Sequence, residues 1–412
     1  MAKRQKIKAE DAGNQEIGQA RPNRAAQPVY LDNQATTPTD PRVVEAMLPF
    51  FTERFGNPHS TGHAYGWDAE EAVEQARAEV AALIGASARE IVFTSGATES
   101  NNLAIKGAAR FHRDRRPHVV TCATEHKCVL ESCRQMEREG HRVTVLPVRS
   151  DGLIDLDLLR ETVTEETAVV SIMAVNNEIG VIQPLAEIAA ICREKGAYFH
   201  CDAAQAVGKI PLDVAAAGID LLSISGHKVY GPKGIGALYV RRRPRVRLEP
   251  LIDGGGQERG LRSGTLPTPL CVGLGVTARL AATEMEEEAA RISGLKERLL
   301  EGIRRRLDGV QLNGHADQRI AGNLSLAFEG VDAEALMRAT PRLALSTGSA
   351  CTSASVEPSY VLQALGLPEK LSRASLRIGI GRFTTEAEVD VAIEELVSKV
   401  RALRAAGSQA AE

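Results

Sequence analysis

The chain has 412 residues, of which 43% are apolar and 25% are charged, and its formal net charge is −3. This length favours two domains over one compact core, and the composition is typical of a soluble globular protein. The nearly balanced charge argues against direct binding to nucleic acid. No apolar run reaches the roughly 18 residues that a membrane span needs, so no membrane contact is expected.

The N-terminal segment, residues 1–27, is polar and lacks the apolar stretch of a secretion signal, so we expect a disordered tail there. The chain contains seven cysteines, an odd number that favours reduced thiols and a cytoplasmic location over a disulfide framework. The spacings between Cys122, Cys128 and Cys133 match no common zinc pattern. We therefore expect no metal site.

From residue 90 onward, short apolar runs alternate with helical patterns. The expected strands are 90–95, 118–123, 142–148, 168–175, 197–203 and 221–226, and the clearest helices are 98–111 and 185–196. This alternation predicts an α/β fold with a mostly parallel sheet and helices on both of its faces. Because ligands bind outside the carboxyl ends of such strands, polar residues that follow the strands are the candidates for a site.

A long helical pattern from about Pro269 to Leu307 connects this sheet to a C-terminal region that reads as a smaller α+β unit. We expect the large domain to comprise residues 38–286. The small domain would comprise 28–37 and 287–404, and residues 405–412 would be a frayed end.

Polar residues follow several of the expected strands. Gly96, Ala97 and Thr98 precede a helix, where free N–H groups and the positive end of the helix dipole can bind an anion. A plain turn with Thr98 as the helix cap is the alternative. His126 and Asn177 each follow a later strand, and His126 is either structural or an aromatic plate over a cofactor ring.

The densest group of polar residues follows the last two expected strands. Lys228 lies in the stretch SISGHKVYGPKGIG, where Ser225 and His227 can donate hydrogen bonds to a phosphate and the glycines allow close approach of the backbone. Asp202 and Gln205 lie in YFHCDAAQ, where the acid could cap a helix or bind a cationic ring nitrogen. A lysine and such an acid are the two groups that pyridoxal 5'-phosphate (PLP) requires, so the sequence indicates this cofactor.

Two further residues have the chemistry of a substrate site. Arg377 could be a surface arginine, or it could bind the α-carboxylate of a substrate in bidentate fashion. Cys351 lies in LSTGSACTSAS, among small residues that could not bury it in a core. A thiol in such a segment is suited to act as a nucleophile, since the thiolate is the reactive form.

The ordered set of motifs resembles one family, the cysteine desulfurases of the IscS/NifS type, which belong to the fold type I PLP enzymes. The similarity extends over roughly residues 29–403. It rests on the stretches YLDNQATTP, FGNPHS, TSGATESNNLAIKG, TEHK, NNEIG, DAAQAVGK, SGHKVYGPKGIGALY, GGGQERGLRSGT, GSACTSAS and VEPSYVLQALG.

The resemblance implies a PLP-dependent transferase fold of the aspartate aminotransferase type, and it assigns the residues around the cofactor. Lys228 would form the Schiff base, Asp202 would bind the pyridinium nitrogen, and Gln205 would bind the phenolic oxygen. His126 would stack on the ring and act with Lys228 in proton transfer. The phosphate and the remaining cofactor contacts would come from Ala97, Thr98, Asn177, Ser225, His227 and, from the second subunit of a homodimer, Thr265.

The resemblance also implies the reaction, which converts L-cysteine to L-alanine. Asn177 and Arg377 would hold the substrate, and Cys351 would take its sulfur as a persulfide. The sulfur would then pass to acceptor proteins such as an iron–sulfur scaffold.

Three alternatives differ in chemistry. A selenocysteine lyase would use nearly the same residues and stays open. An aminotransferase would need no mobile cysteine, and the intact Lys228, Asp202, His126 and Cys351 argue against a PLP-binding or sulfur-relay scaffold without turnover. Many members of the family that the sequence resembles continue into a tail that helps to bind the scaffold, and the resemblance does not extend to that tail, because the sequence given ends at RAAGSQAAE. The sequence determines neither the sulfur acceptor nor the role of the N-terminal extension.

Overall fold

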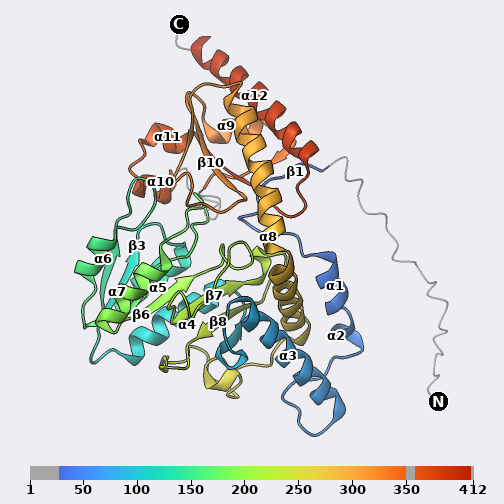
Figure 1. Cartoon of the computed structure of the whole chain (residues 1–412), viewed down its shortest axis with the longest axis vertical. Helices are drawn as coiled ribbons and strands as arrows, with labels where there is room; N and C mark the ends of the chain where they lie inside the picture. The colour runs from blue at the N-terminus through green and yellow to red at the C-terminus, as the bar shows by residue number, and fades with distance from the viewer. Residues whose placement is uncertain (1–26, 349–357, 410–412) are drawn as a thin grey trace, which may run out of the picture.

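The computed structural model describes residues 27–348 and 358–409 (Figure 1). Within them the strands are β1 (Val29–Tyr30), β2 (Ile91–Thr94), β3 (His118–Cys122), β4 (Arg142–Leu146), β5 (Thr167–Ser171), β6 (Tyr198–Asp202), β7 (Leu221–Ser225), β8 (Gly236–Val240), β9 (Val310–Leu312), β10 (Asn323–Phe328), β11 (Leu343–Ala344) and β12 (Ser375–Gly379). The α-helices are α1 (Pro41–Met47), α2 (Pro49–Thr52), α3 (Ala64–Leu83), α4 (Ala97–Phe111), α5 (Lys127–Arg138), α6 (Leu156–Thr162), α7 (Leu185–Lys195), α8 (Thr268–Arg304), α9 (Ala333–Ala339), α10 (Tyr360–Ala364), α11 (Glu369–Arg373) and α12 (Glu386–Gln409). Short 3₁₀ turns are η2 (Ala88–Glu90), η3 (Gly226–Lys228) and η4 (Glu258–Gly260).

In the described chain the main sheet has seven strands in the order β2-β8-β7-β6-β5-β3-β4. Strands β3 to β7 run parallel, whereas β8 is antiparallel to both β7 and β2. Every residue of β3, β5 and β7 is buried, which is typical of strands covered by helices on both faces. The predicted mostly parallel α/β sheet is confirmed.

Alternate residues of each central strand enter two different apolar layers. On β3, Val120 contributes to the cluster that includes Phe199, whereas Val119 contributes to the cluster under helix α4 that includes Leu103. This alternation is the period of two that places successive side chains on opposite faces of a sheet. Burial on both faces fixes the register of the sheet, and therefore the places where its strands end.

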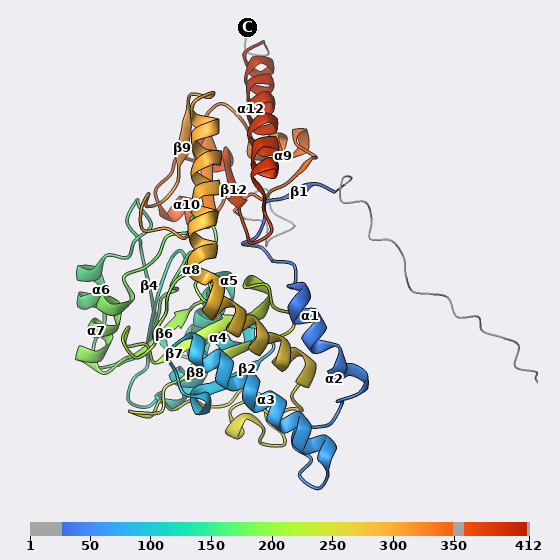
Figure 2. The ribbon, with the colours of Figure 1, turned by 45° about the vertical axis from the view of Figure 1, so that its right-hand side comes forward.

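A smaller antiparallel sheet, β12-β10-β9, packs with helices α8 and α12 around a third apolar cluster. Helix α8 has 37 residues and contributes Leu274 to the core of the main sheet and Leu299 to this smaller core. Figure 2 shows α8 rising from beside the main sheet to the smaller one. Strand β1 pairs with β11, which brings the start of the described chain to the smaller unit. The domain boundaries given above remain a prediction.

The C-terminal end differs from its expected form, because α12 continues to Gln409 and residues 405–409, expected to fray, are helical. The alanines of this segment, which favour helix more than any other residue, explain the extension. The expected tail at 1–27 lies, apart from its last residue, outside the described residues. No helix in the described part of the chain combines the length and the hydropathy needed to cross a bilayer.

Gly236 on β8 lies where two backbones touch. A Cβ atom there would be 2.3 Å from the carbonyl oxygen of Ile224 and 2.6 Å from the Cα atom of Gly96. We expect Gly236→Ala to reduce the free energy of unfolding by about 1–3 kcal/mol, because the sheet would have to move to admit a methyl group.

Gly62 is the matched control, because a Cβ atom there would meet nothing within 4 Å. Denaturant unfolding of Gly236→Ala and Gly62→Ala checks the prediction. Equal stability of the two variants would contradict it.

Candidate active site

The carboxyl ends of the parallel strands open onto a cavity of about 460 Å³. Ten of the predicted site residues line this cavity: Ala97, Thr98, His126, Asn177, Asp202, Gln205, Ser225, His227, Lys228 and Arg377. Two others do not. Thr265 is exposed and is not among the lining residues, and Cys351 lies outside the described residues.

Lys228 reaches the cavity from the 3₁₀ turn η3, which follows directly on strand β7. Its ammonium group donates hydrogen bonds to the main-chain carbonyls of Gln34 (2.7 Å) and Ala35 (2.6 Å). The same N-terminal segment is tied to the turn, because Thr37 donates its N–H to the carbonyl of His227 at 2.9 Å. The lysine therefore lies at the point where the N-terminal segment meets the end of the sheet.

Asp202 is the last residue of β6 and only 4% exposed. One carboxylate oxygen accepts from Asn101 Nδ2 at 2.7 Å, and the other accepts from the N–H of Ala204 at 2.9 Å. These two donors fix the orientation of the carboxylate beside the cavity. A buried acid so fixed is suited to bind a protonated ring nitrogen.

His126 caps the N-terminus of helix α5, since its Nδ1 atom accepts the N–H of Cys128 at 3.2 Å. The Cys128 sulfur is 3.0 Å from the same nitrogen, and burial raises the pKa of this thiol to about 12. The pKa of His126 is lowered by burial, with Asp202 opposing and Lys228 reinforcing the shift. The imidazole is therefore neutral near pH 7, with its proton on Nε2, because Nδ1 is an acceptor.

The part of the cavity at the N-terminal end of helix α4 is suited to bind an anion. Gly96 precedes helix α4 with φ at 146°, in a region that favours glycine, and the first N–H groups of α4 have no acceptor within the helix. Ser225 and His227 line the same space. Burial, with the positive charges of Lys228, Lys233 and Lys209, lowers the pKa of His227 to about 4. Because this imidazole is neutral, it can donate one hydrogen bond to a phosphate group.

Arg377 enters the cavity from β12 of the smaller sheet. Its guanidinium pairs with Asp32 at 2.9 Å and donates to the carbonyl of Asn177 at 3.1 Å. Its Nε atom, and the Oδ1 atom of Asn177, are buried without a hydrogen-bond partner in the described chain. Buried polar atoms are rarely left unpaired, so this part of the cavity is suited to a polar ligand.

These groups fit PLP. The α4 end supplies donors for a phosphate, Asp202 supplies a buried acid for the ring nitrogen, and Lys228 supplies an amine in the same cavity. The fold and the cavity thus define a PLP-dependent enzyme.

The sequence patterns did not assign to this site Gln34, Thr36 and Cys128, which line the cavity, or Asn101, which donates to Asp202. Gln34 and Thr36 belong to the stretch YLDNQATTP, but no periodicity shows that it lies against Lys228. Asn101 follows Thr98 by three residues, the spacing that places two side chains on one face of a helix. The spacing of Cys128 from its neighbouring cysteines bears only on a metal site and does not indicate its contact with His126.

The comparisons with known proteins agree with this geometry. Residues 29–391 match the family model described as "Aminotransferase class-V". The "Cysteine desulfurase IscS" of Rickettsia bellii is 60% identical over 377 residues, which cover 92% of each chain. A solved structure titled "NIFS-LIKE PROTEIN" has a TM-score of 0.85 at 36% identity and covers 91% of this chain and 100% of its own. Another solved structure, "SspA in complex with cysteine", has a TM-score of 0.76 at 40% identity and covers 86% of this chain and 99% of its own.

The chain belongs to the class-V aminotransferase family, and within that family to the cysteine desulfurases. It is accordingly a PLP-dependent enzyme, as the cavity indicated.

Cysteine reactivity offers a direct check on the site. Burial raises the pKa of every described thiol, namely Cys122, Cys128, Cys133, Cys192, Cys201 and Cys271. Since the thiolate is the form that reacts, these six should be alkylated slowly near neutral pH. We expect brief treatment with iodoacetamide, followed by peptide mass spectrometry, to show label first on Cys351.

Denatured protein is the control, because all seven cysteines should then be labelled at similar rates. Labelling of a described cysteine in the native protein as fast as that of Cys351 would contradict the prediction.

Proposed function

We propose that Lys228 and Cys351 carry out the desulfuration of L-cysteine to L-alanine in this enzyme, with the persulfide formed on Cys351. The observation that supports the proposal most directly is the meeting of Lys228, Asp202 and His126 at one cavity. PLP, when bound, supplies an electron sink for the charge that develops at the substrate Cα atom. The side chains of this chain bind the substrate and move the protons.

Lys228 is the group that takes the proton from the substrate Cα atom. Its nitrogen lies against two main-chain carbonyls, which orient it without neutralising it. Arg377 binds the α-carboxylate of the substrate, because its guanidinium lines the cavity and retains an unpaired Nε donor. His126 is neutral and would hold the face of the cofactor ring, and its protonated Nε2 atom is available to donate.

Cys351 completes the reaction as a thiolate that attacks the substrate Sγ atom. A sulfur–sulfur bond forms and the Cβ–Sγ bond breaks, so that Cys351 becomes a persulfide. The electron pair of the broken bond stays on Cβ, which takes up a proton, and with a proton returned to Cα the product is L-alanine. The persulfide sulfur then passes to an acceptor protein.

An iron–sulfur scaffold is among the acceptors that we propose, and we place the protein in the cytoplasm. The six described cysteines are all free thiols, which supports a reducing compartment.

Alanine and sulfide release from L-cysteine with a reductant tests the function. Lys228→Ala should abolish both products because no group takes the Cα proton. Cys351→Ala should abolish turnover while L-cysteine still changes the absorption of the bound cofactor. Lys370→Ala, an exposed lysine, and Cys192→Ala, a cysteine of the main core, are the controls and should retain activity. Normal turnover by Cys351→Ala would exclude its role as nucleophile.

We further propose that the enzyme is a homodimer. Large apolar side chains are exposed on α1, on α2, on the first turn of α3 and between these helices: Val44, Leu48, Phe51, Phe55, Tyr65 and Trp67. Figures 1 and 2 show α1 and α2 at one outer edge of the ribbon. Exposed apolar groups of this extent mark association sites. Thr265 is exposed and outside the cavity of its own chain, which supports a contact with the cofactor of a second copy.

Trp67 is 57% exposed and is the single tryptophan of the chain. We expect Trp67→Lys and Leu48→Lys to convert the dimer to a monomer in sedimentation velocity, since a buried unpaired charge opposes association. Val145→Lys, at a site 50% exposed on the edge strand β4, should leave the dimer intact. A wild-type monomer, or dimers in all three variants, would contradict the proposed interface.

A further inference from the structure

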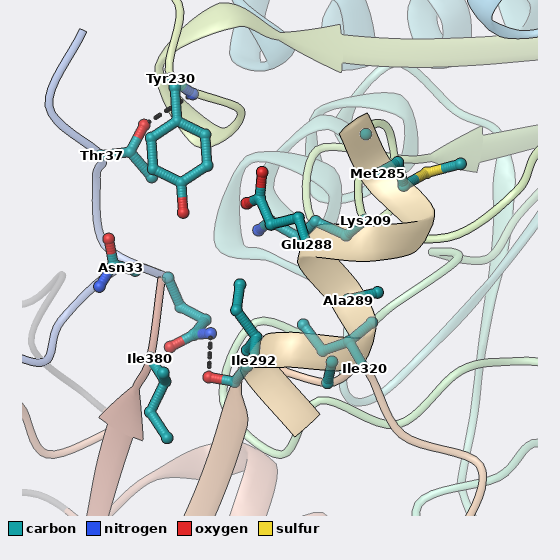
Figure 3. A pocket seen from close by; sticks show the side chains of 14 residues that line it. Asn33, Thr37, Lys209, Tyr230, Met285, Glu288, Ala289, Ile292, Ile320 and Ile380 are labelled. Atoms are coloured by element: carbon teal, nitrogen blue, oxygen red, sulfur yellow. Dashed lines mark hydrogen bonds between the residues drawn. The ribbon is translucent and has the colours of Figure 1, made fainter. Parts of the chain in front are cut away.

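A second, smaller cavity lies beside the active site, between the main sheet, helix α8 and the smaller sheet. It holds about 30 Å³ and is lined by residues that include Gln34, Lys209, Met285, Glu288 and Ile380 (Figure 3). Figure 3 shows Lys209 next to Glu288 of α8. Neither residue has a part in the chemistry described above, so the purpose of a partly buried lysine at this position needs an explanation.

Lys209 acts on the active site through one hydrogen bond. Its ammonium group donates to Gln205 Oε1 at 2.7 Å. On the other side of the same amide, Gln205 Nε2 donates to the main-chain carbonyl of Gln34 at 2.8 Å, and this carbonyl also accepts from Lys228 Nζ at 2.7 Å. A continuous chain of hydrogen bonds thus connects Lys209 to the catalytic lysine.

The contact determines which way the amide of Gln205 faces. An ammonium group can only donate, so Oε1 must point to Lys209 and Nε2 must point into the active-site cavity. A cation on Oε1 also withdraws electron density from the amide, which makes Nε2–H a stronger donor. Both effects favour a glutamine that donates to a negatively charged oxygen.

Lys209 keeps this contact across neutral pH. Burial and the positive charge of Lys228 lower the pKa of Lys209 to about 7, Glu288 opposes the shift, and Arg377 adds to it. A neutral amine can both donate and accept, but the carbonyl of Gln34 can only accept, so it holds Nε2 and leaves Oε1 facing Lys209 when the charge is lost.

We propose that Lys209 is a positioning residue, which orients Gln205 to donate to the phenolic oxygen of the bound cofactor. The inference rests on the proposed function, because it takes from the family resemblance the role of Gln205 in binding that oxygen. It adds a residue from outside the active-site cavity to the machinery that holds the cofactor.

A double-mutant cycle on PLP binding tests the proposal. The four proteins are wild type, Lys209→Met, Gln205→Leu and the double variant, prepared without cofactor and titrated with PLP. We expect Lys209→Met to weaken PLP binding about tenfold, the effect of one hydrogen bond to a charged group. Gln205→Leu should weaken it at least as much, and the double variant should bind PLP as Gln205→Leu does, because Lys209 then has no amide to orient.

The pH titration of the visible absorption of the bound cofactor is a second readout, and Lys209→Met and Gln205→Leu should shift it in the same direction. Met285→Leu, which changes a residue lining the same small cavity, is the control and should leave both readouts unchanged. Thermal unfolding of all variants separates loss of binding from loss of fold.

Additive effects of the two substitutions, or an unchanged affinity in either single variant, would overturn the positioning role while leaving the desulfurase intact. A wild-type protein that fails to bind PLP would instead overturn the proposed function, and the role of Lys209 with it.

Discussion

The main-chain carbonyl of Gln34 is the point on which the active site depends. It accepts hydrogen bonds from Lys228 and from Gln205, so its position fixes the catalytic lysine and a cofactor ligand together. The segment that bears it is attached to the smaller sheet. Asn33 Nδ2 donates to the carbonyl of Gly379 at 2.8 Å, and Gln34 Nε2 donates to that of Gly322 at 3.0 Å. A Cβ atom on Gly379 would lie 2.7 Å from the backbone nitrogen of Asn33, which cannot move aside as a side chain could, so the close approach favours glycine there.

The active site is therefore formed by residues from both sheets. Lys228 and Asp202 follow strands of the main sheet, whereas Arg377 extends from the smaller one. The distance between the amine that moves the proton and the guanidinium that binds the carboxylate is therefore set by the packing of the two units. Helix α8 connects the two units, because it contributes buried side chains to the apolar cores of both.

Burial determines the protonation states of the two histidines that line the cavity. The pKa values of His126 and His227 are lowered, so both imidazoles are neutral and each can donate through one nitrogen while accepting through the other. Arg377 adds a positive charge that a guanidinium keeps at every pH near neutrality. A cavity with neutral donors around fixed cations is suited to a ligand that carries a phosphate and a carboxylate.

Sequence by itself determined the α/β class, six of the seven strands of the main sheet, the long helix and ten of the residues that line the cavity, whereas strand β8 was not among the expected strands. Those elements have strong apolar periodicity, and chemistry-bearing residues such as Asp202 and Lys228 directly follow strands, where parallel topology brings them to one edge. No sequence pattern indicates that the carbonyl of Gln34 accepts from Lys228, or that Lys209 contacts Gln205 from a separate cavity. Hydrogen bonds of this kind depend on where main-chain carbonyls and flexible side chains lie after packing, so only the tertiary structure decided them.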